Sequence, residues 1–190
     1  ATKSNIVAEK VEAEQQHHIP MLKWVAQVAR SRIDRGRLIL LENGWRSRAV
    51  TLPCMEDLID YPDGMVPEES FQWSRGDQCM LGQKDKESGL PYMASTAWGT
   101  NSKCIRDALS ILCDERHEHQ RVEGSNSFGP RSVQKAEWPL RLCRTILKAT
   151  ARELVERVGW SAFPAMMAEE VAGELGPLDT PDGPVSGHGE

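Results

Sequence analysis

The sequence lacks long apolar runs, and no stretch approaches the roughly 20 consecutive apolar residues that a membrane-spanning helix needs. Its first ten residues are polar and of mixed charge, which is not the pattern of a secretory signal peptide. Basic residues are not in surplus either, since 23 Lys and Arg stand against 28 Asp and Glu, for a net charge of −5. Nucleic-acid binders depend on neutralising phosphates, so any contact with DNA or RNA requires a local basic patch. We expect no membrane association.

Paired cysteines and common catalytic signatures are also missing. The five cysteines are odd in number and widely spaced, and none forms a Cys-x-x-Cys pair; they are Cys54, Cys79, Cys104, Cys113 and Cys143. This pattern does not suggest a disulfide framework and predicts reduced thiols in a cytoplasmic or nuclear compartment. The chain contains no P-loop, GxGxxG, GxSxG or HExxH motif, so the nucleotide-binding, hydrolase and metalloprotease classes that these motifs define are not indicated.

Length and composition favour one folded domain. The chain has 190 residues, of which 39% are hydrophobic and 27% charged, enough for one packed core. We expect a polar segment over residues 1–18, the domain over residues 19–160, and a short helix followed by a tail over residues 161–190. After Gly176 the sequence is rich in Pro, Gly, Asp and Ser, which predicts a disordered tail or linker.

The strongest structural pattern is a helix followed by a buried strand. Apolar residues at helical spacing predict an amphipathic helix over residues 20–35, which Gly36 would end. Leu38, Ile39, Leu40 and Leu41 then form an unbroken apolar run, which predicts a strand buried on both faces. A helix followed by Gly and a buried strand is half of a parallel α/β layer.

Weaker patterns predict further elements later in the chain. They are a short helix over residues 53–60, a loop over residues 61–69, a strand over residues 71–81 with a hairpin partner over residues 90–98, a helix over residues 102–113, a polar loop over residues 114–130 and a helix over residues 139–158.

The end of the buried strand is the first candidate site. Glu42 and Asn43 follow the apolar run directly, and ligands of open α/β sheets bind beyond the carboxyl ends of the strands. A carboxylate in that position can hydrogen-bond to or protonate a ring nitrogen. The alternative is a solvated strand end, because Asn43-Gly44 is a turn dipeptide.

A second candidate site contains one cysteine and two histidines. Cys113, His117 and His119 lie within seven residues of one another and would supply three zinc ligands, with Cys104 as the fourth. The spacing matches no recognised zinc finger, so the alternative is a polar loop after a helix that ends in a buried cysteine. Cys79 lies two residues after Asp77, which is an acid and not a cation or base, and this predicts a buried strand cysteine rather than an activated nucleophile.

Basic residues form the third candidate site. Many of them lie in predicted loops or at element ends, where they would track a phosphate backbone together with exposed aromatic rings. Scattered surface charge is the alternative. The basic residues that we expect to contact nucleic acid are Arg46, Arg48, Lys103 and Arg131, with Trp45 and Trp98 as stacking rings.

Several stretches share their order and spacing with one family. They are residues 35–43, 77–82, 96–102, 113–124 and 138–143. In this order they resemble the later part of the cytosine-5 DNA methyltransferase-like domain found in some phages. They are more similar still to a related segment of copia-type retrotransposon polyproteins. The resemblance covers residues 21–148.

The resemblance implies a Rossmann-like fold, S-adenosylmethionine as cofactor and contact of Glu42 with the target cytosine ring. This chain departs from the family at Gly44, where Pro or Val is usual, and at Ala94-Ser95, where basic residues are usual. The glycine-rich cofactor loop and the Pro-Cys nucleophile of the family would lie upstream of Ala1. Pro53-Cys54 comes after Glu42 instead of before it, so we do not assign Cys54 as the nucleophile.

Together these observations predict an α/β protein with an incomplete Rossmann-like, methyltransferase-like sheet, flanking helices and a disordered C-terminal tail. The leading hypothesis is a non-catalytic segment of a retrotransposon polyprotein, inactive alone, which acts as a scaffold with DNA or RNA and the rest of the polyprotein as partners. One alternative is half of a split or truncated S-adenosylmethionine-dependent DNA cytosine methyltransferase. The other is a small zinc-supported binding module with Cys113, His117 and His119 as ligands.

Overall fold

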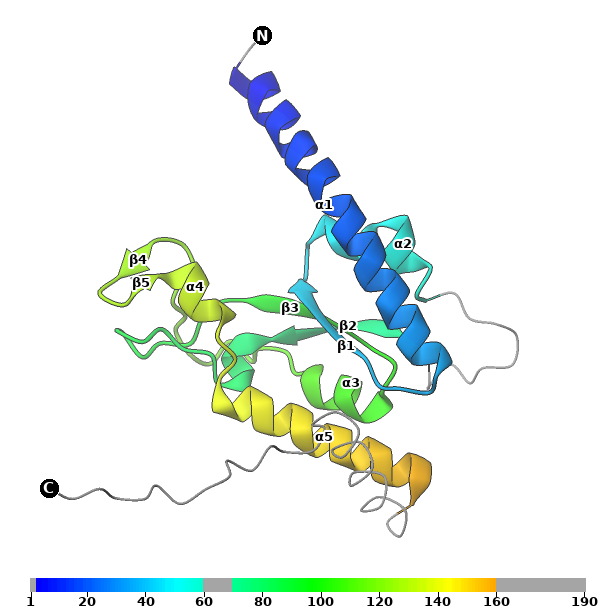
Figure 1. The fold of residues 1–190 in the computed structure, drawn as a ribbon. Helices are drawn as coiled ribbons and strands as arrows, with labels where there is room; N and C mark the ends of the chain where they lie inside the picture. Colours follow the sequence, from blue (N-terminus) through cyan, green and yellow to red (C-terminus); the bar gives the residue numbers. More distant parts are fainter. Residues whose placement is uncertain (1–2, 60–69, 160–190) are drawn as a thin grey trace, which may run out of the picture. The chain divides into compact units, whose positions relative to one another are not determined.

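The structure, a computed structural model, describes residues 3–59 and 70–159 of the chain (Figure 1). The chain divides into two units, Ala1–Glu153 and Leu154–Glu190, and the central sheet and both buried clusters belong to the first. The loop predicted over residues 61–69 and the tail predicted over residues 161–190 lie outside the described residues. Within the described ranges, no helix combines the length and the apolar character needed to cross a membrane.

Three antiparallel strands form the central sheet. They are β1 (Leu40–Gly44), β2 (Gln72–Asp77) and β3 (Ser95–Thr100), in the order β1-β3-β2. Trp98 in the middle strand stands opposite Glu42 on one side and Ser74 on the other. The predicted mixed α/β class is confirmed, and the predicted hairpin partners pair as β2 and β3, joined through a long connection.

The parallel layer predicted around β1 is wrong, because β1 pairs antiparallel with β3. The apolar run has another cause, which is that helices cover both faces of the sheet. Leu41 packs against the cluster on the α1 face, and Leu40 packs against the cluster on the opposite face. Leu40 and Leu41 are only half-buried, and packing against helices on both faces does not establish parallel pairing.

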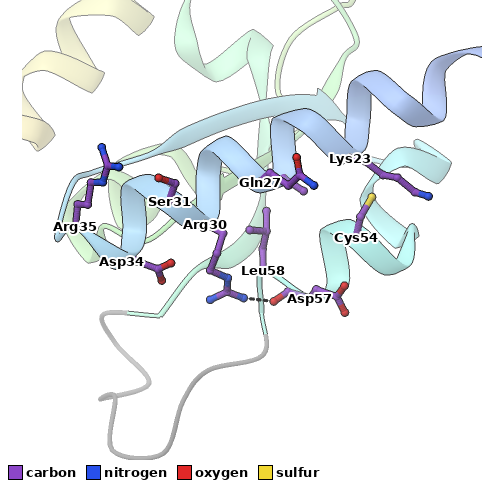
Figure 2. Close-up of a pocket in the computed structure, with 10 residues that line it drawn as sticks. Lys23, Gln27, Arg30, Ser31, Asp34, Arg35, Cys54, Asp57 and Leu58 are labelled. Atoms are coloured by element: carbon purple, nitrogen blue, oxygen red, sulfur yellow. Dashed lines mark hydrogen bonds between the residues drawn. The ribbon is translucent and has the colours of Figure 1, made fainter.

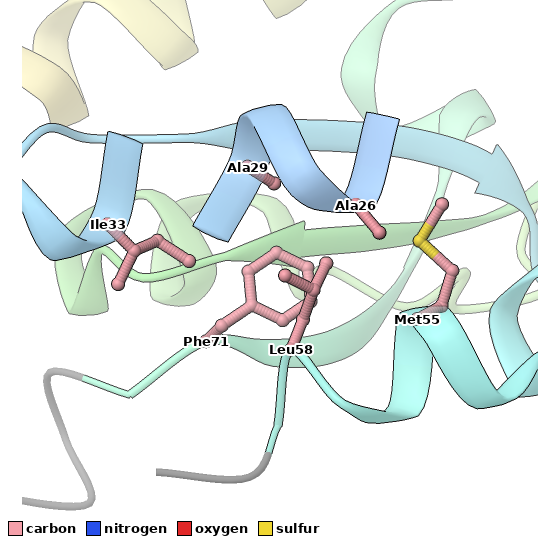
Figure 3. Close-up of a cluster of buried hydrophobic side chains, with 6 residues drawn as sticks. All are labelled: Ala26, Ala29, Ile33, Met55, Leu58 and Phe71. Carbon is pink, nitrogen blue, oxygen red and sulfur yellow. The ribbon is translucent and has the colours of Figure 1, made fainter. Parts of the chain in front are cut away.

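Helices α1 (Lys3–Asp34) and α2 (Pro53–Glu56) lie over one face of the sheet. A cluster of buried side chains joins them to the start of β2 (Figure 3), and its members are Ala26, Ala29, Ile33, Met55, Leu58 and Phe71. Both alanines are almost completely buried in this cluster, so a larger side chain at either position would have to displace its neighbours. Helix α1 continues through residue 18, where we predicted the boundary between the polar segment and the domain.

Helices α3 (Lys103–Leu109) and α5 (Leu140–Val158) cover the opposite face. Their buried cluster is centred on Trp98, which is fully buried, and consists of Leu81, Trp98, Ile105, Leu109, Leu142 and Ala149. The N-terminus of α3 is tied to α5, because the carboxylate of Glu153 accepts hydrogen bonds from the Ser102 hydroxyl (2.7 Å) and the Cys104 amide (2.9 Å). A carboxylate in this position also stabilises the helix dipole.

The helix predicted over residues 102–113 ends at Leu109. Ser110 caps the helix by bonding to the carbonyl of Arg106, and beyond it the chain bonds to the end of β2. The amide of Asp77 donates to the carbonyl of Ile111 (2.8 Å), and the amide of Cys113 donates to the carboxylate of Asp77 (2.9 Å). These tertiary bonds replace the last turn that the apolar spacing predicts.

The predicted polar loop over residues 114–130 contains a short hairpin, β4 (Ser125–Asn126) and β5 (Gly129–Pro130), which leads into α4 (Arg131–Ala136). The fully buried carboxylate of Asp85 holds this part together. It accepts hydrogen bonds from the Tyr92 hydroxyl (2.9 Å), the Asn126 amide (2.8 Å) and the Arg131 guanidinium (3.1 Å). Polar hydrogen bonds hold this part of the chain together, and they leave no periodic apolar pattern in the sequence.

Gly76 in β2 has no room for a side chain. A methyl group there would overlap the carbonyl oxygen of Leu109 and come within 2.8 Å of the Trp98 indole nitrogen. We expect Gly76→Ala to lower the free energy of unfolding by about 1–3 kcal/mol, as overpacking does in cores. Gly44→Ala is the matched control, because a methyl at that strand position meets nothing within 4 Å. Equal effects of the two variants in urea titrations would contradict the packing described for Gly76.

The Asp85 network predicts a pH dependence of stability. Hydrogen bonds from the Ser88 amide, the Tyr92 hydroxyl and Arg131 outweigh the effect of burial and hold the pKa of the Asp85 carboxyl well below its usual range. A depressed folded-state pKa gives stability that is present above the unfolded value of about 3.9 and is lost as the pH falls below it.

Wild type should therefore be more stable than Asp85→Asn at pH 7, and its advantage should shrink as the pH falls below about 4. Unfolding free energies of both proteins at pH 7 and at pH 3 measure this. Asp107→Asn is the control, since Asp107 forms an exposed ion pair with Lys103 and such pairs contribute little. A constant difference between wild type and Asp85→Asn across this range would count against the proposed ionised state.

Candidate metal centre

Two segments far apart in the sequence form a cluster of cysteine and histidine side chains. Cys79 lies in η3 (Gln78–Leu81), the 3-10 helix directly after β2. Cys113, His117 and His119 lie in the irregular segment that follows α3. That segment is fixed to β2 at Cys113, and it is fixed again just past His119, where the Gln120 amide donates to the carbonyl of Pro91 (2.8 Å). The fold thus holds both ends of the segment and places its three donors beside Cys79.

Two of the separations between donor atoms match those of a tetrahedral metal, and the other donor pairs lie within 4.8 Å. The two sulfurs and two imidazole nitrogens all lie within 4.8 Å of one another. The sulfur of Cys113 is 3.4 Å from Nε2 of His119 and 3.7 Å from Nε2 of His117. Ligands at zinc bond lengths of about 2.0–2.3 Å in a tetrahedron stand about 3.3–3.8 Å apart. Two thiolates and two imidazoles are a preferred zinc set, so these residues fit zinc.

Neighbouring groups orient two of the ligands. Nδ1 of His117 is 3.5 Å from the carboxylate of Asp114, which favours Nε2 as the nitrogen facing the cluster. The amide of Glu115 donates to the sulfur of Cys113 at 3.3 Å. Glu115 has a φ of 58°, in the left-handed region that non-glycine residues seldom adopt. This sharp turn brings the two histidines back toward Cys113.

Asp77 anchors the cluster to the sheet. Its buried carboxylate accepts hydrogen bonds from the Cys113 amide (2.9 Å), the Ser95 hydroxyl (2.5 Å) and Arg75 (3.2 Å). Burial by itself would raise the pKa of Asp77, but these hydrogen bonds outweigh it and leave the pKa below its usual range. The ionised carboxylate fixes Cys113 to the last residue of β2, two positions before Cys79.

Cys79 is not an independent nucleophile. Burial, followed by the neighbouring Cys113 and Asp77, raises the pKa of its thiol. A thiol with a raised pKa is protonated at neutral pH and unreactive on its own. Binding a metal would displace this proton, because the thiolate is the metal ligand.

A solvent-open cleft of about 470 Å³ borders the cluster, and all four candidate ligands line it. Its lining also includes the exposed apolar side chains of Met93 and Leu112, and Arg75. The cluster therefore lies at the surface of the protein, within reach of small solutes.

The structure brings together the three ligands expected from the sequence but supplies a different fourth. Cys104 lies in α3, where its amide bonds to Glu153, and it is not part of the cluster. Cys79 takes the place expected for Cys104. Cys79 is buried as predicted, but it lies in η3 and not in the strand expected over residues 71–81, which ends at Asp77. Its neighbours could not be predicted, because no local spacing connects the end of β2 to the segment after α3.

The predicted catalytic pair does not follow the strand, because Glu42 and Asn43 lie inside β1 and stand opposite Trp98 and Ala97. The carboxylate of Glu42 accepts hydrogen bonds from the Gln78 side chain (2.9 Å) and the Trp138 indole (2.6 Å), and Lys135 lies 3.8 Å away. The side chain of Asn43 accepts from the amide of Gly44. Within the described residues, these contacts tie α4 and the start of α5 to the sheet.

The predicted nucleic-acid contacts do not share one surface. Arg46 and Arg48 follow β1, whereas Lys103 follows β3, and the antiparallel register places the ends of these two strands at opposite ends of the sheet. Arg131 is bound to the buried Asp85. Trp98, one of the two expected stacking rings, is fully buried. Nucleic-acid binding stays a prediction.

A further cleft, of about 610 Å³, lies between α1 and α2 (Figure 2). Cationic and acidic side chains line it together, among them Lys23, Arg35, Asp34 and Asp57, and Arg30 donates a hydrogen bond to the carbonyl of Asp57. These mixed charges favour neither an anion nor a cation.

Comparisons with protein-family models, with curated proteins and with solved structures found no significant match to this chain. The resemblance to methyltransferase-like domains therefore stays a prediction. The functional assignment depends on the geometry of the Cys and His cluster.

Proposed function

We propose that this chain is a zinc-supported binding module, in which Zn²⁺ bound by Cys79, Cys113, His117 and His119 fixes the segment after α3 to the end of β2. The observation that supports it is the convergence of two sulfurs and two imidazole nitrogens within 4.8 Å from distant parts of the sequence.

The number of ligands favours a structural zinc. Four protein ligands complete a tetrahedral zinc and leave no position for the water that a catalytic zinc activates. Residues 110–119 form no regular element and bury little apolar surface, since Ile111 and Leu112 are exposed. A bound metal would supply the cohesion that apolar burial does not give this segment.

The binding surface that we assign is the cleft beside the zinc. Loops that a rigid scaffold holds in place often carry binding residues, and exposed apolar side chains beside such loops mark interaction surfaces. Met93 and Leu112 are both exposed and line this cleft. The net charge of −5 and the separated basic residues favour a protein over a nucleic acid as the partner.

The two methyltransferase hypotheses are weaker proposals. A Rossmann-like sheet is mainly parallel, whereas each strand pair in the three-stranded sheet described here is antiparallel. Transfer of a labelled methyl group from S-adenosylmethionine to DNA, abolished by Glu42→Gln, would favour them over the zinc module.

We expect purified reduced protein to contain one zinc per chain, measured by inductively coupled plasma mass spectrometry. Metal present at 1,000 times its Kd stabilises a protein by about 4 kcal/mol. A Tm shift of about 2–4 °C per kcal/mol then predicts that chelation lowers the Tm by about 8–16 °C. Replacing the zinc with cobalt should produce, in the absorption spectrum, the ligand-field and thiolate charge-transfer bands of a tetrahedral site.

Cys79→Ser should lose the zinc and melt near the temperature of the chelated wild type. Cys104→Ser is the control, since it makes the same substitution at a half-buried thiol outside the cluster, and it should keep the metal. Folded wild type without metal, with a Tm that chelators do not change, would rule out the zinc module.

A further inference from the structure

We propose that Cys79 and Cys113 form a redox modification site, at which a peroxide oxidises the two zinc-bound thiolates to a disulfide and releases the metal. This inference rests on the proposed zinc module and adds a means of regulating it.

The position of the two sulfurs carries the proposal. They lie within 4.8 Å of each other, and both cysteines line the solvent-open cleft. The remaining cysteines lie elsewhere: Cys54 lines the α1–α2 cleft, and Cys104 and Cys143 belong to α3 and α5. Cys79 and Cys113 are therefore the thiol pair placed for an internal disulfide that a small oxidant can reach.

The different burial of the two residues sets the order of events. Cys113 is half-buried whereas Cys79 is 8% exposed, so an oxidant in the cleft meets Cys113 first. The Cys113 thiolate attacks one oxygen of the peroxide, the O–O bond breaks, and a sulfenic acid and hydroxide form. The Cys79 thiolate then attacks the sulfenic sulfur, which forms the S–S bond and expels a second hydroxide. Two protons convert the hydroxides to water, so two electrons pass from the sulfur pair to the peroxide.

Forming the disulfide requires only local movement. A disulfide bond is about 2.05 Å long, so the sulfurs must approach each other by less than 3 Å. Cys79 is held in η3, whereas Cys113 lies in the irregular segment after α3. Movement of that segment is enough to close the bond while the sheet stays intact.

Disulfide formation would remove the metal. A thiolate binds zinc through its negative charge, and a disulfide has none. His117 and His119 alone would then hold the ion, and two imidazoles are too few for a stable protein site. Zinc release would free the segment that carries Leu112 and so weaken the assigned binding surface.

The test uses the full, reduced, zinc-loaded chain treated with hydrogen peroxide. Released zinc is followed with a chromogenic chelator, and disulfides are mapped by peptide mass spectrometry. We expect one zinc released for each Cys79–Cys113 disulfide, with recovery after dithiothreitol and added zinc. Cys104→Ser should behave as wild type. Metal-free Cys79→Ala should accumulate a Cys113 sulfenic acid that dimedone traps.

Zinc-loaded protein that keeps its metal under peroxide, or that loses it while another cysteine is oxidised and no Cys79–Cys113 disulfide forms, overturns the proposal. Zinc content before oxidation tests the zinc module separately. A chain that binds zinc but does not form this disulfide keeps its proposed function and loses only the redox site.

Discussion

The hydrogen bonds of the Asp77 carboxylate are the constraint on which the candidate site depends. Asp77 is the last residue of β2. Its carboxylate joins β2 to β3 through the hydroxyl of Ser95, and it joins the sheet to the segment after α3 through the amide of Cys113. A charged carboxylate can be buried here because each of its oxygens has a donor. Together with the backbone bond from the Asp77 amide to the Ile111 carbonyl, these bonds hold Cys113 beside Cys79 in the structure.

Much of the fold could be predicted from the sequence where apolar side chains recur at regular spacing. Such residues lie in the half of α1 that faces the sheet, in β1 at Leu40, and along α5. They pack into the two buried clusters. Pairing direction could not be predicted, because an apolar run buried on both faces is compatible with either kind of sheet. The β4–β5 hairpin and α4 were also missed, since Asp85 holds them through hydrogen bonds that leave no periodic pattern.

The candidate site was predictable in part, for a similar reason. Cys113, His117 and His119 are close in sequence, so their spacing alone indicates a ligand group. Cys79 is a tertiary neighbour, and only the bonds between β2 and the segment after α3 reveal it. Glu42 shows the opposite case. Its place after the apolar run suggested a strand end open to ligands, whereas it lies inside β1 and its carboxylate is bound by Gln78 and Trp138.

The strand order β1-β3-β2 has a consequence for synthesis on the ribosome. Both outer strands pair only with β3, which is the last of the three to be made. Residues 40–44 and 72–77 therefore leave the exit tunnel with unpaired edges and must wait for residues 95–100 before any strand pairing described here can form. Exposed strand edges in nascent chains favour aggregation. Early docking of α1 would cover one apolar face of β1 during this interval, but its edges stay unpaired until β3 arrives.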